Sequence, residues 1–422
     1  MAHYLINGGN RLEGEVVISG AKNAGLPIVL ATILAGESCR IENLPSIEDI
    51  HKLQQILVRM GASVDFTPDG GMRVDPRGIS ECNVTFEMVS ALRASYYLLG
   101  ALLGRYGRAR IALPGGCSIG QRPIDQHIKA MRALGADVVI EKGIVNATAQ
   151  RLYGAEIYLD VVSVGATINT MLAAARAEGQ TIINNAAKEP HVVDVANFIN
   201  MMGGSVKGAG TDVIRIMGKK QLHGCTYAII PDQIEAGTFM IAAAATCGDV
   251  IIKNVIPTHL EAISAKLMES GVSVIEGDDG HDFYIRVTAG GRPRAVHIKT
   301  LPYPGFPTDL QQPMMAFLST AAGNSYIVEN IFEDRFNHVA ELRRMGANIV
   351  VNSRTATIEG VSRLTGAPLY ATDLRAGAAL IIAALMAEGE SRIEQIHYID
   401  RGYEYLERKL QALGADIRRV NG

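Results

Sequence analysis

One segment of the sequence brings a thiol, two basic side chains and three glycines together. It reads LPGGCSIGQRPIDQH over residues 113–127, with Cys117 between the glycines and Arg122 and His127 after it. A neighbouring cation favours the thiolate, which is a nucleophile, whereas a thiol that stays protonated serves as an acid. The segment matches neither a Walker loop nor a dinucleotide fingerprint. An incidental thiol in a mobile loop is therefore the alternative to a reactive one.

Three cations, Lys22, Arg93 and Arg375, stand at or near the starts of strongly apolar segments. A positive side chain at a helix N-terminus opposes the helix dipole, so an anion is needed beside it. Other apolar segments begin with polar residues that suit an N-cap or a first turn, namely Ser163, Asp232, Asp309 and Asp373. Capping explains these four residues but not the cations. We expect the cations and helix N-termini to form a pocket for a ligand with several negative charges.

An Asp-Arg pair occurs near the start of two later helices. Arg401 follows Asp400 in HYIDRGYEYLERKL, and Arg335 stands at the matching place in EDRFNHVAELRRMG. Pairing of Arg401 with a neighbouring carboxylate on a solvated face is one interpretation. The recurrence at matching places favours a functional role instead.

The elements that position these residues come from an internal repeat. Two series of glycines each recur six times, at spacings of 66 to 75 residues. Glycine just past a helix end suits a left-handed cap, so each series indicates a helix, a glycine and then a strand. The chain is therefore expected to hold six βαβαββ repeats of about 70 residues. The first series is Gly61, Gly135, Gly203, Gly271, Gly346 and Gly414, and the second is Gly36, Gly107, Gly179, Gly248, Gly323 and Gly389.

The ends of the chain suggest how the repeats are grouped. The last repeat stops without its final strand, and the first strands, in residues 1–21, have no partner before them. We expect the N-terminal strands to complete the final repeat, which favours two closed groups of three over one open solenoid. The predicted fold class is α/β, with one domain over 22–230 and another over 1–21 plus 231–422. The ligand is expected in a cleft between them, with the apolar helices buried.

Composition narrows the class of protein. The 422 residues are 48% hydrophobic with a net charge of −3, which excludes disorder and gives no basic field for nucleic acid or anionic lipid. The five cysteines show no CxxC pair, which argues against a disulfide framework and a zinc site. The start lacks a signal-peptide pattern, and the longest apolar stretches are too short to span a membrane. These features predict a cytosolic protein.

Seven short segments together resemble one enzyme family, the UDP-N-acetylglucosamine 1-carboxyvinyltransferases. They are SGAKNAGLP (19–27), LRAS (92–95), LPGGCSIGQRPID (113–125), SVGAT (163–167), FPTDLQ (306–311), ATDLRAGAAL (371–380) and IDRGYE (399–404). The resemblance runs from the first strand to the last helix. It implies the fold shared with EPSP synthase, two inside-out α/β barrel domains of three repeats each, with the active site in the cleft between them.

The activity implied by the resemblance is transfer of the enolpyruvyl group of phosphoenolpyruvate to the 3-hydroxyl of UDP-N-acetylglucosamine, with release of phosphate. This reaction is the first committed step of peptidoglycan synthesis, and no cofactor or metal is implied. The chemistry needs an acid near the vinyl carbon, a base near the sugar hydroxyl and cations around the phosphate.

Matched motif by motif, the resemblance assigns a role to each of these residues. Cys117 would donate the proton to the phosphoenolpyruvate methylene, and Asp309 would receive the sugar hydroxyl proton. The phosphate would be held by Lys22, Arg122 and Arg401, with Asn23 as a neighbour and Arg93 near the nucleotide sugar. Arg335, Asp373 and Arg375 would complete the charged wall. The nucleotide would contact Arg122, Pro123, Ile124, Asp125, Gln126, His127, Ser163, Val164, Gly165 and Ile331.

The sequence departs from the family at peripheral places. Gln233 and Val161 stand where some relatives carry a cation, and His397-Tyr398 is a pair that relatives show in reverse order. Cys117 predicts sensitivity to the alkylating antibiotic fosfomycin, because members with Asp there resist it. Two alternatives are weighed: an enolpyruvyl transferase acting on shikimate 3-phosphate, which lacks the cysteine loop, and a non-catalytic nucleotide-sugar sensor, which needs no acid–base pair.

Overall fold

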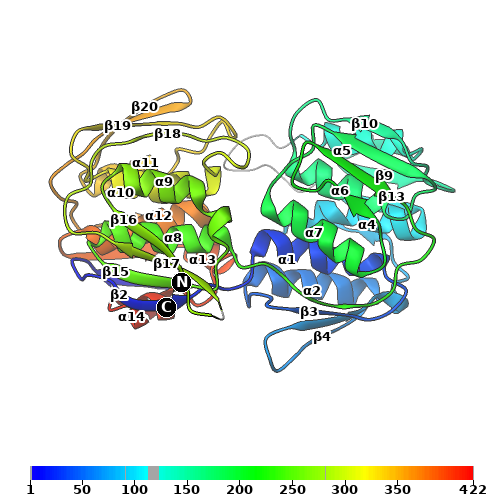
Figure 1. Ribbon diagram of the computed structural model, residues 1–422, viewed down its shortest axis with the longest axis horizontal. Coiled ribbons are helices and arrows are strands. Elements are labelled where there is room, and N and C mark those ends of the chain that lie inside the picture. The colour runs from blue at the N-terminus through cyan, green and yellow to red at the C-terminus, as the bar shows by residue number, and fades with distance from the viewer. Residues whose placement is uncertain (1, 91, 113–122, 281, 422) are drawn as a thin grey trace. The chain divides into compact units, whose positions relative to one another are not determined.

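A computed structural model describes the chain except for residues 1, 91, 113–122, 281 and 422 and the side chains of Ser90 and Arg93. The described residues form two compact units (Figure 1). Unit 1 takes those of 2–19 and 231–421, and unit 2 takes those of 20–112 and 123–230. The chain passes from unit 1 to unit 2 at residues 19–20 and returns at 230–231.

Unit 2 contains three four-stranded sheets, with strand orders β14-β3-β5-β4, β6-β7-β9-β8 and β10-β11-β13-β12. Its strands are β3 (Cys39–Glu42), β4 (Ser63–Phe66), β5 (Met72–Asp75), β6 (Asn83–Val84), β7 (Arg108–Ala112), β8 (Asp137–Glu141), β9 (Ile144–Thr148), β10 (Glu156–Tyr158), β11 (Gln180–Asn184), β12 (Val206–Lys207), β13 (Val213–Met217) and β14 (Thr226–Ala228). Its helices are α1 (Lys22–Ala31), α2 (Glu48–Met60), α3 (Phe86–Ser90), α4 (Tyr97–Tyr106), α5 (Asp125–Ala133), α6 (Val164–Ala174) and α7 (Pro190–Met201), with 3₁₀ turns η1 (Thr32–Leu34), η2 (Pro76–Gly78) and η3 (Arg93–Tyr96).

Unit 1 also contains three four-stranded sheets, with orders β16-β17-β15-β2, β18-β19-β21-β20 and β22-β23-β1-β24. Its strands are β1 (His3–Asn7), β2 (Glu13–Val17), β15 (Asp249–Lys253), β16 (Ser273–Asp278), β17 (Phe283–Thr288), β18 (His297–Lys299), β19 (Asn324–Val328), β20 (Asn348–Asn352), β21 (Thr355–Glu359), β22 (Pro368–Tyr370), β23 (Glu390–Glu394) and β24 (Asp416–Val420). Its helices are α8 (Gln233–Ala245), α9 (Glu261–Glu269), α10 (Gln311–Leu318), α11 (Val339–Arg344), α12 (Leu374–Met386), α13 (His397–Asp400) and α14 (Leu406–Ala412), with 3₁₀ turns η4 (Pro257–His259) and η5 (Thr308–Leu310).

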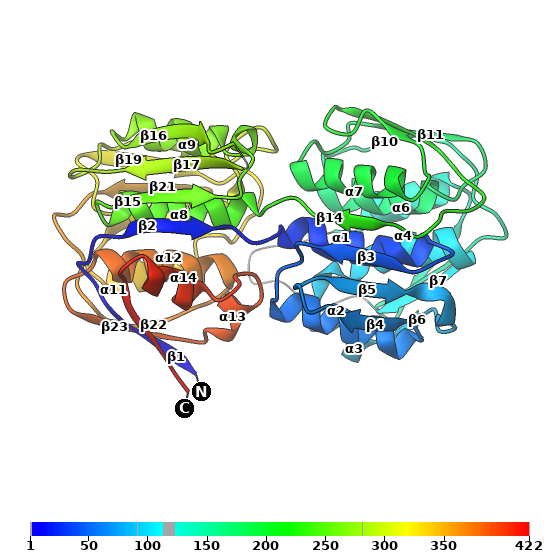
Figure 2. The ribbon, with the colours of Figure 1, turned by 60° about the horizontal axis from the view of Figure 1, so that its bottom comes forward.

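The six sheets share one pattern, which confirms the βαβαββ repeat. In the third repeat, β10 runs parallel to β11, and β13 pairs antiparallel with both β11 and β12. Helix α6 connects the parallel strands, and helix α7 follows β11. Because the helix between parallel strands is apolar on all sides, it is buried within its unit. Figure 2 shows helices α8 and α12 lying inside unit 1, with the sheets around them.

The two N-terminal strands have different places. Strand β1 pairs antiparallel with both β23 and β24, so it completes the sixth repeat. Strand β2 instead runs parallel to β15 and is the leading strand of the fourth repeat (Figure 2). The expectation that both N-terminal strands complete the final repeat is therefore wrong for β2. The leading strand of the first repeat comes from far along the chain, since β14 runs parallel to β3.

The glycine series behave differently from each other. All six glycines of the first series have positive φ values, between 88° and 105°, as predicted for left-handed caps. In the second series Gly36 and Gly248 do not. At the fourth repeat Cys247 takes the left-handed conformation, and a Cβ on Gly248 would lie 2.3 Å from the Leu12 carbonyl oxygen. This glycine is therefore required by a close approach to the segment before β2, not by its φ angle.

Candidate active site

In unit 1, Asp309 lies between two buried arginines. Its Oδ1 accepts a hydrogen bond of 2.7 Å from Arg335 Nη2, and its Oδ2 accepts bonds of 3.2 and 3.0 Å from Arg375 Nε and Nη2. The side chain of Asp309 is 26% exposed, whereas those of Arg335 and Arg375 are 3% and 5% exposed. The structure thus brings together three of the residues predicted for the charged wall and the base.

This arrangement controls the charge of Asp309. Burial alone raises the pKa of a carboxyl group, but the charges and hydrogen bonds of Arg375 and Arg335 outweigh it and hold the pKa of Asp309 well below its ordinary value. Asp309 is therefore an anion in this arrangement and a poor base while both arginines contact it.

Local structure fixes the two arginines. Asp373 caps α12 by accepting hydrogen bonds of 2.8 and 3.0 Å from the amides of Arg375 and Ala376. The Arg375 guanidinium lies 5.3 Å from the ring centre of Tyr403, whose hydroxyl is 2.9 Å from Thr238 Oγ1 on α8. Arg335 comes before α11, and Arg335 Nη1 donates a bond of 3.0 Å to Thr308 Oγ1.

In unit 2, Lys22 opens α1 and pairs with Asp49 at 2.7 Å, with side chains 10% and 2% exposed. Asp49 lies in the first turn of α2. Sequence reasoning inferred that a cation at a helix N-terminus needs an anion. In this structure a protein carboxylate supplies it, Asp49 for Lys22 and Asp309 for Arg375. Asn23 follows Lys22 in α1 and is half-buried.

His127 is a buried neutral imidazole. Two backbone partners orient the side-chain amide of Asn169. Its Oδ1 accepts a hydrogen bond of 2.6 Å from the Gly100 amide, and its Nδ2 donates one of 2.7 Å to the Tyr96 carbonyl. The same Nδ2 lies 2.9 Å from His127 Nδ1, so Nδ1 is the acceptor and Nε2 carries the hydrogen. Burial lowers the pKa of His127 to about 4, against the opposing effect of Asp125.

The Nε2–H group of His127 faces the first turn of α6. A Cβ on Gly165 would lie 3.0 Å from both Cε1 and Nε2 of His127, so a larger residue there would require the ring to shift by a few tenths of an ångström. Ser163 caps α6 with a bond of 3.2 Å from the Ala166 amide. The structure therefore brings together the predicted segments 123–127 and 163–165 in one place within unit 2.

Polar contacts hold the start of α5 near the end of β10. Gln126 Nε2 donates to Asp125 at 2.7 Å and to Asp160 at 3.1 Å, while Gln126 Oε1 accepts 2.9 Å from the Asp160 amide. Lys129 pairs with Asp160 at 2.7 Å. Pro123 and Ile124 lead directly into α5.

The capping interpretation is confirmed for three residues. Ser163, Asp232 and Asp373 each accept a hydrogen bond from their helix's first turn. Asp309 does not, because the residue before η5 is Pro307 and no side chain caps that turn. The carboxylate of Asp309 contacts the arginines instead.

Several predicted residues are described less fully. Cys117 and Arg122 lie outside the described residues, and so does the side chain of Arg93. Arg401 is half-buried at the end of α13, and the matching Arg335 is buried. The backbone amide of Ile331 donates a hydrogen bond of 2.8 Å to Glu329 Oε1.

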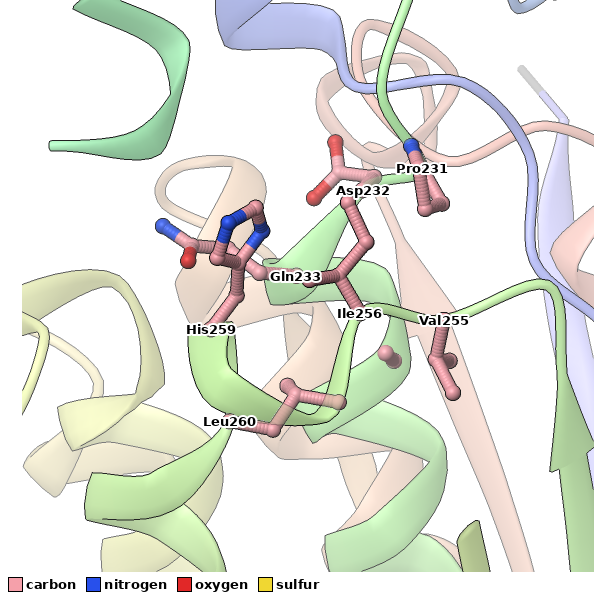
Figure 3. A pocket seen from close by; sticks show the side chains of 8 residues that line it. Pro231, Asp232, Gln233, Val255, Ile256, His259 and Leu260 are labelled. Carbon is pink, nitrogen blue, oxygen red and sulfur yellow. The ribbon is translucent and has the colours of Figure 1, made fainter. Parts of the chain in front are cut away.

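Figure 3 shows a hollow at the start of α8 in unit 1. Asp232, Gln233 and His259 line it, with apolar side chains that include Val255 and Leu260. One departure from the family, Gln233, therefore lies in this hollow. Of the other departures, Val161 is 59% exposed, and the His397 and Tyr398 rings lie 4.2 Å apart.

Sequence reasoning missed the partners that orient the site. Asp49, Thr308 and Glu329 were not predicted, although Asp49 stands in the first turn of an amphipathic helix and Glu329 directly follows strand β19. Within the described part of the chain, no three His, Cys, Asp or Glu side chains gather as a metal site. None of the described helices is long and apolar enough to cross a membrane.

Comparisons with known proteins place these features in one class. A family model described as EPSP synthase (3-phosphoshikimate 1-carboxyvinyltransferase) matches residues 6–410. A crystal structure of the enolpyruvyl transferase NikO from Streptomyces tendae superposes with a TM-score of 0.87 at 29% identity, over 100% of this chain and 99% of that one. Fold and sequence thus define a carboxyvinyl transferase.

Full-length relatives narrow the class. UDP-N-acetylglucosamine 1-carboxyvinyltransferase 3 of Caldanaerobacter subterraneus subsp. tengcongensis is 57% identical over 420 residues, and the enzyme of Clostridium botulinum is 56% identical over 421. Each match covers 100% of both chains. The chain belongs to the UDP-N-acetylglucosamine 1-carboxyvinyltransferases within the EPSP synthase family.

Proposed function

We propose that this enzyme transfers the enolpyruvyl group of phosphoenolpyruvate to the 3-hydroxyl of UDP-N-acetylglucosamine and releases phosphate. The identity of more than half of all residues with full-length relatives of that name carries the proposal. The half-buried Asp309 with the buried Arg335 and Arg375, and the neutral His127 beside the start of α6, support it, because both groups suit anionic substrates.

The reaction is an addition followed by an elimination. The sugar 3-oxygen forms a bond to C2 of phosphoenolpyruvate while the methylene carbon takes a proton from the Cys117 thiol. The hydroxyl proton passes to Asp309. In the second stage the methyl group returns a proton to the Cys117 thiolate left by the first stage, the carbon–carbon double bond forms again, and the bond from C2 to the phosphate oxygen breaks, so that phosphate leaves. Lys22, Arg122 and Arg401 hold the phosphate, with Asn23 as a hydrogen-bonding neighbour and Arg93 near the nucleotide sugar.

Asp309 needs to change state before it acts as a base. The contacts of Arg375 and Arg335 keep its pKa low, and an anionic substrate that takes hydrogen bonds from either arginine weakens those contacts. We therefore expect substrate binding to raise the pKa of Asp309 toward its ordinary value. Substrate binding thus prepares the base that the addition needs.

The nucleotide binds through segments that pack together in unit 2. The proposal places its polar groups on residues 123–127 and on the amides at the start of α6, Ser163 to Gly165, with Ile331 beside the sugar. A helix N-terminus offers unpaired amides to a diphosphate, and the Nε2–H of His127 adds a neutral donor.

Product analysis tests this function against its alternatives. The purified enzyme is incubated with phosphoenolpyruvate and either UDP-N-acetylglucosamine or shikimate 3-phosphate, and the products are identified by mass and by NMR. We expect enolpyruvyl-UDP-N-acetylglucosamine only. An enolpyruvyl product of shikimate 3-phosphate would support the sister activity, and binding of the nucleotide sugar without any product would indicate a sensor.

Fosfomycin tests the assignment of Cys117. The enzyme is treated with the antibiotic, and the modified peptide is identified by mass. We expect one adduct at Cys117, which Cys117→Asp removes while keeping turnover. The other thiols serve as internal controls, since Cys39 and Cys82 are buried and Cys225 and Cys247 are half-buried. Labelling that persists in the Asp variant would contradict the assignment.

A further inference from the structure

Glu329 is a fully buried carboxylate at the end of β19, with 0% exposure. By strand pairing, the matching place of four other repeats holds Asn43, Asn185, Asn254 and Gln395, and all of these are exposed or half-buried. Burying a carboxylate is costly unless hydrogen bonds replace its water. The fifth repeat therefore has a specific reason for this glutamate.

Neutral donors surround Glu329 among the described residues. Oε1 accepts bonds of 2.9 Å from Thr300 Oγ1, 2.8 Å from the Ile331 amide and 3.2 Å from the Phe332 amide. Oε2 accepts 2.8 Å from Thr308 Oγ1. One side chain thus joins the end of β18, the η5 turn and the segment after β19.

The hydroxyl of Thr308 links Glu329 to the candidate base. It has a single hydrogen, which it donates to Glu329, so its lone pairs are left for Arg335 Nη1 at 3.0 Å. The other end of the same guanidinium, Nη2, contacts Asp309 at 2.7 Å. Because a guanidinium is planar and rigid, fixing Nη1 also fixes Nη2.

We propose that Glu329 is a positioning residue that sets the geometry of Asp309 through Thr308 and Arg335. This inference rests on the proposed function, in which Asp309 receives the proton of the sugar hydroxyl. Glu329 touches no substrate in this role. Its carboxylate must accept from Thr308, which an amide nitrogen at the same place cannot do.

Four variants test the proposal by steady-state kinetics with both substrates. Glu329→Gln keeps size and shape but places a donor against the hydroxyl of Thr308 or against the three donors at Oε1. Thr308→Val removes the linking hydroxyl, and Thr308→Ser keeps it. Thr300→Val is the matched control, because it removes a hydrogen bond to Glu329, together with the one that Thr300 Oγ1 accepts from the Asn330 amide, but leaves the link through Thr308 intact.

We expect Glu329→Gln and Thr308→Val each to lower kcat about tenfold to a hundredfold, as misplaced catalytic groups do, with KM for phosphoenolpyruvate unchanged. In the double variant that combines Glu329→Gln with Thr308→Val, kcat should fall no further than in the worse of the two single variants. The kcat values of Thr308→Ser and Thr300→Val should stay close to that of the wild type. If Glu329 had a purely structural role, the variants would instead have a lower melting temperature, and the kinetic constants for both substrates would change alike.

Three results would overturn the proposal. They are wild-type kcat in Glu329→Gln, losses that multiply in the double variant, and a loss in Thr300→Val as large as in Thr308→Val. If Glu329→Gln fails to fold, the comparison of Thr308→Val with Thr308→Ser still decides, with equal activity of the two counting against it. An inactive wild type would refute the proposed function itself, so the two failures are distinct.

Discussion

Arg375 donates two hydrogen bonds, of 3.2 and 3.0 Å, to a single oxygen of Asp309. The guanidinium lies at the start of the buried helix α12, where its charge opposes the helix dipole, and the carboxylate offsets that charge. The contact thus serves the folded state and, in the proposed reaction, also restrains the base. Any change to either residue is expected to affect both stability and turnover.

Asp309→Asn tests this double role. Removing one partner of a buried ion pair leaves an uncompensated charge, so the free energy of unfolding should fall by about 3 kcal/mol. Activity should fall at least about 100-fold through loss of the base. Urea unfolding and phosphate release measure the two effects. Arg375→Met added to Asp309→Asn should recover part of the stability but none of the activity, and a double variant less stable than Asp309→Asn would contradict the pairing.

The protonation state of His127 gives a second prediction. Because Asn169 donates to Nδ1 and burial lowers the pKa to about 4, His127 should remain the neutral Nε2–H tautomer from pH 8 down to pH values near 5. Nitrogen NMR of the labelled ring reports this directly. Asn169→Asp is the matched variant: its carboxylate accepts rather than donates, so the hydrogen should move to Nδ1 and the pKa should rise. A wild-type midpoint above pH 6 would refute the assignment.

Asp194 on α7 predicts a pH dependence of stability. Burial raises the pKa of its carboxyl to about 6, although Tyr227 and the Ile230 amide donate hydrogen bonds to it. The unfolded chain loses this proton near pH 4, so between about pH 4 and 6 the folded chain holds the extra proton and stability falls as pH rises. Above pH 6 the free energy of unfolding is therefore lower by about 3 kcal/mol than it is below pH 4.

Asp194→Asn removes this titration. The variant should gain about 3 kcal/mol relative to the wild type as the pH rises from 4 to 7, and the difference should stay constant above that. Urea unfolding at several pH values measures the change. A difference that is independent of pH across the whole range would show that Asp194 titrates normally in the folded chain.

The repeat was predictable because its signals are local. A glycine after a helix and an apolar helix before a strand recur in each repeat. Ser163 and Asp373 stand just before their helices, where an N-cap residue is expected, and both cap them. Strand β2 was not predictable from local signals, since its partner β15 is more than 200 residues away in the chain. Its place depends on how the chain crosses between the units.

The site residues also divide into those with a local signal in the sequence and those placed only by tertiary packing. Lys22, Asp309 and Arg375 were found by residue type and motif. Asp49, which pairs with Lys22, and Glu329, which accepts from Thr308, were not found, because a sequence does not show which carboxylates are buried or which donors they meet. Only tertiary packing places Thr308 between Glu329 and Arg335.

The central claim is that the enzyme transfers the enolpyruvyl group with Asp309 as the base, and the rate of phosphate release tests it most directly. The wild type and Asp309→Asn are each given phosphoenolpyruvate with and without UDP-N-acetylglucosamine. We predict release by the wild type only when both substrates are present, and release at least about 100-fold slower in Asp309→Asn. Release without the nucleotide sugar, or an equal rate in the two proteins, would contradict this account.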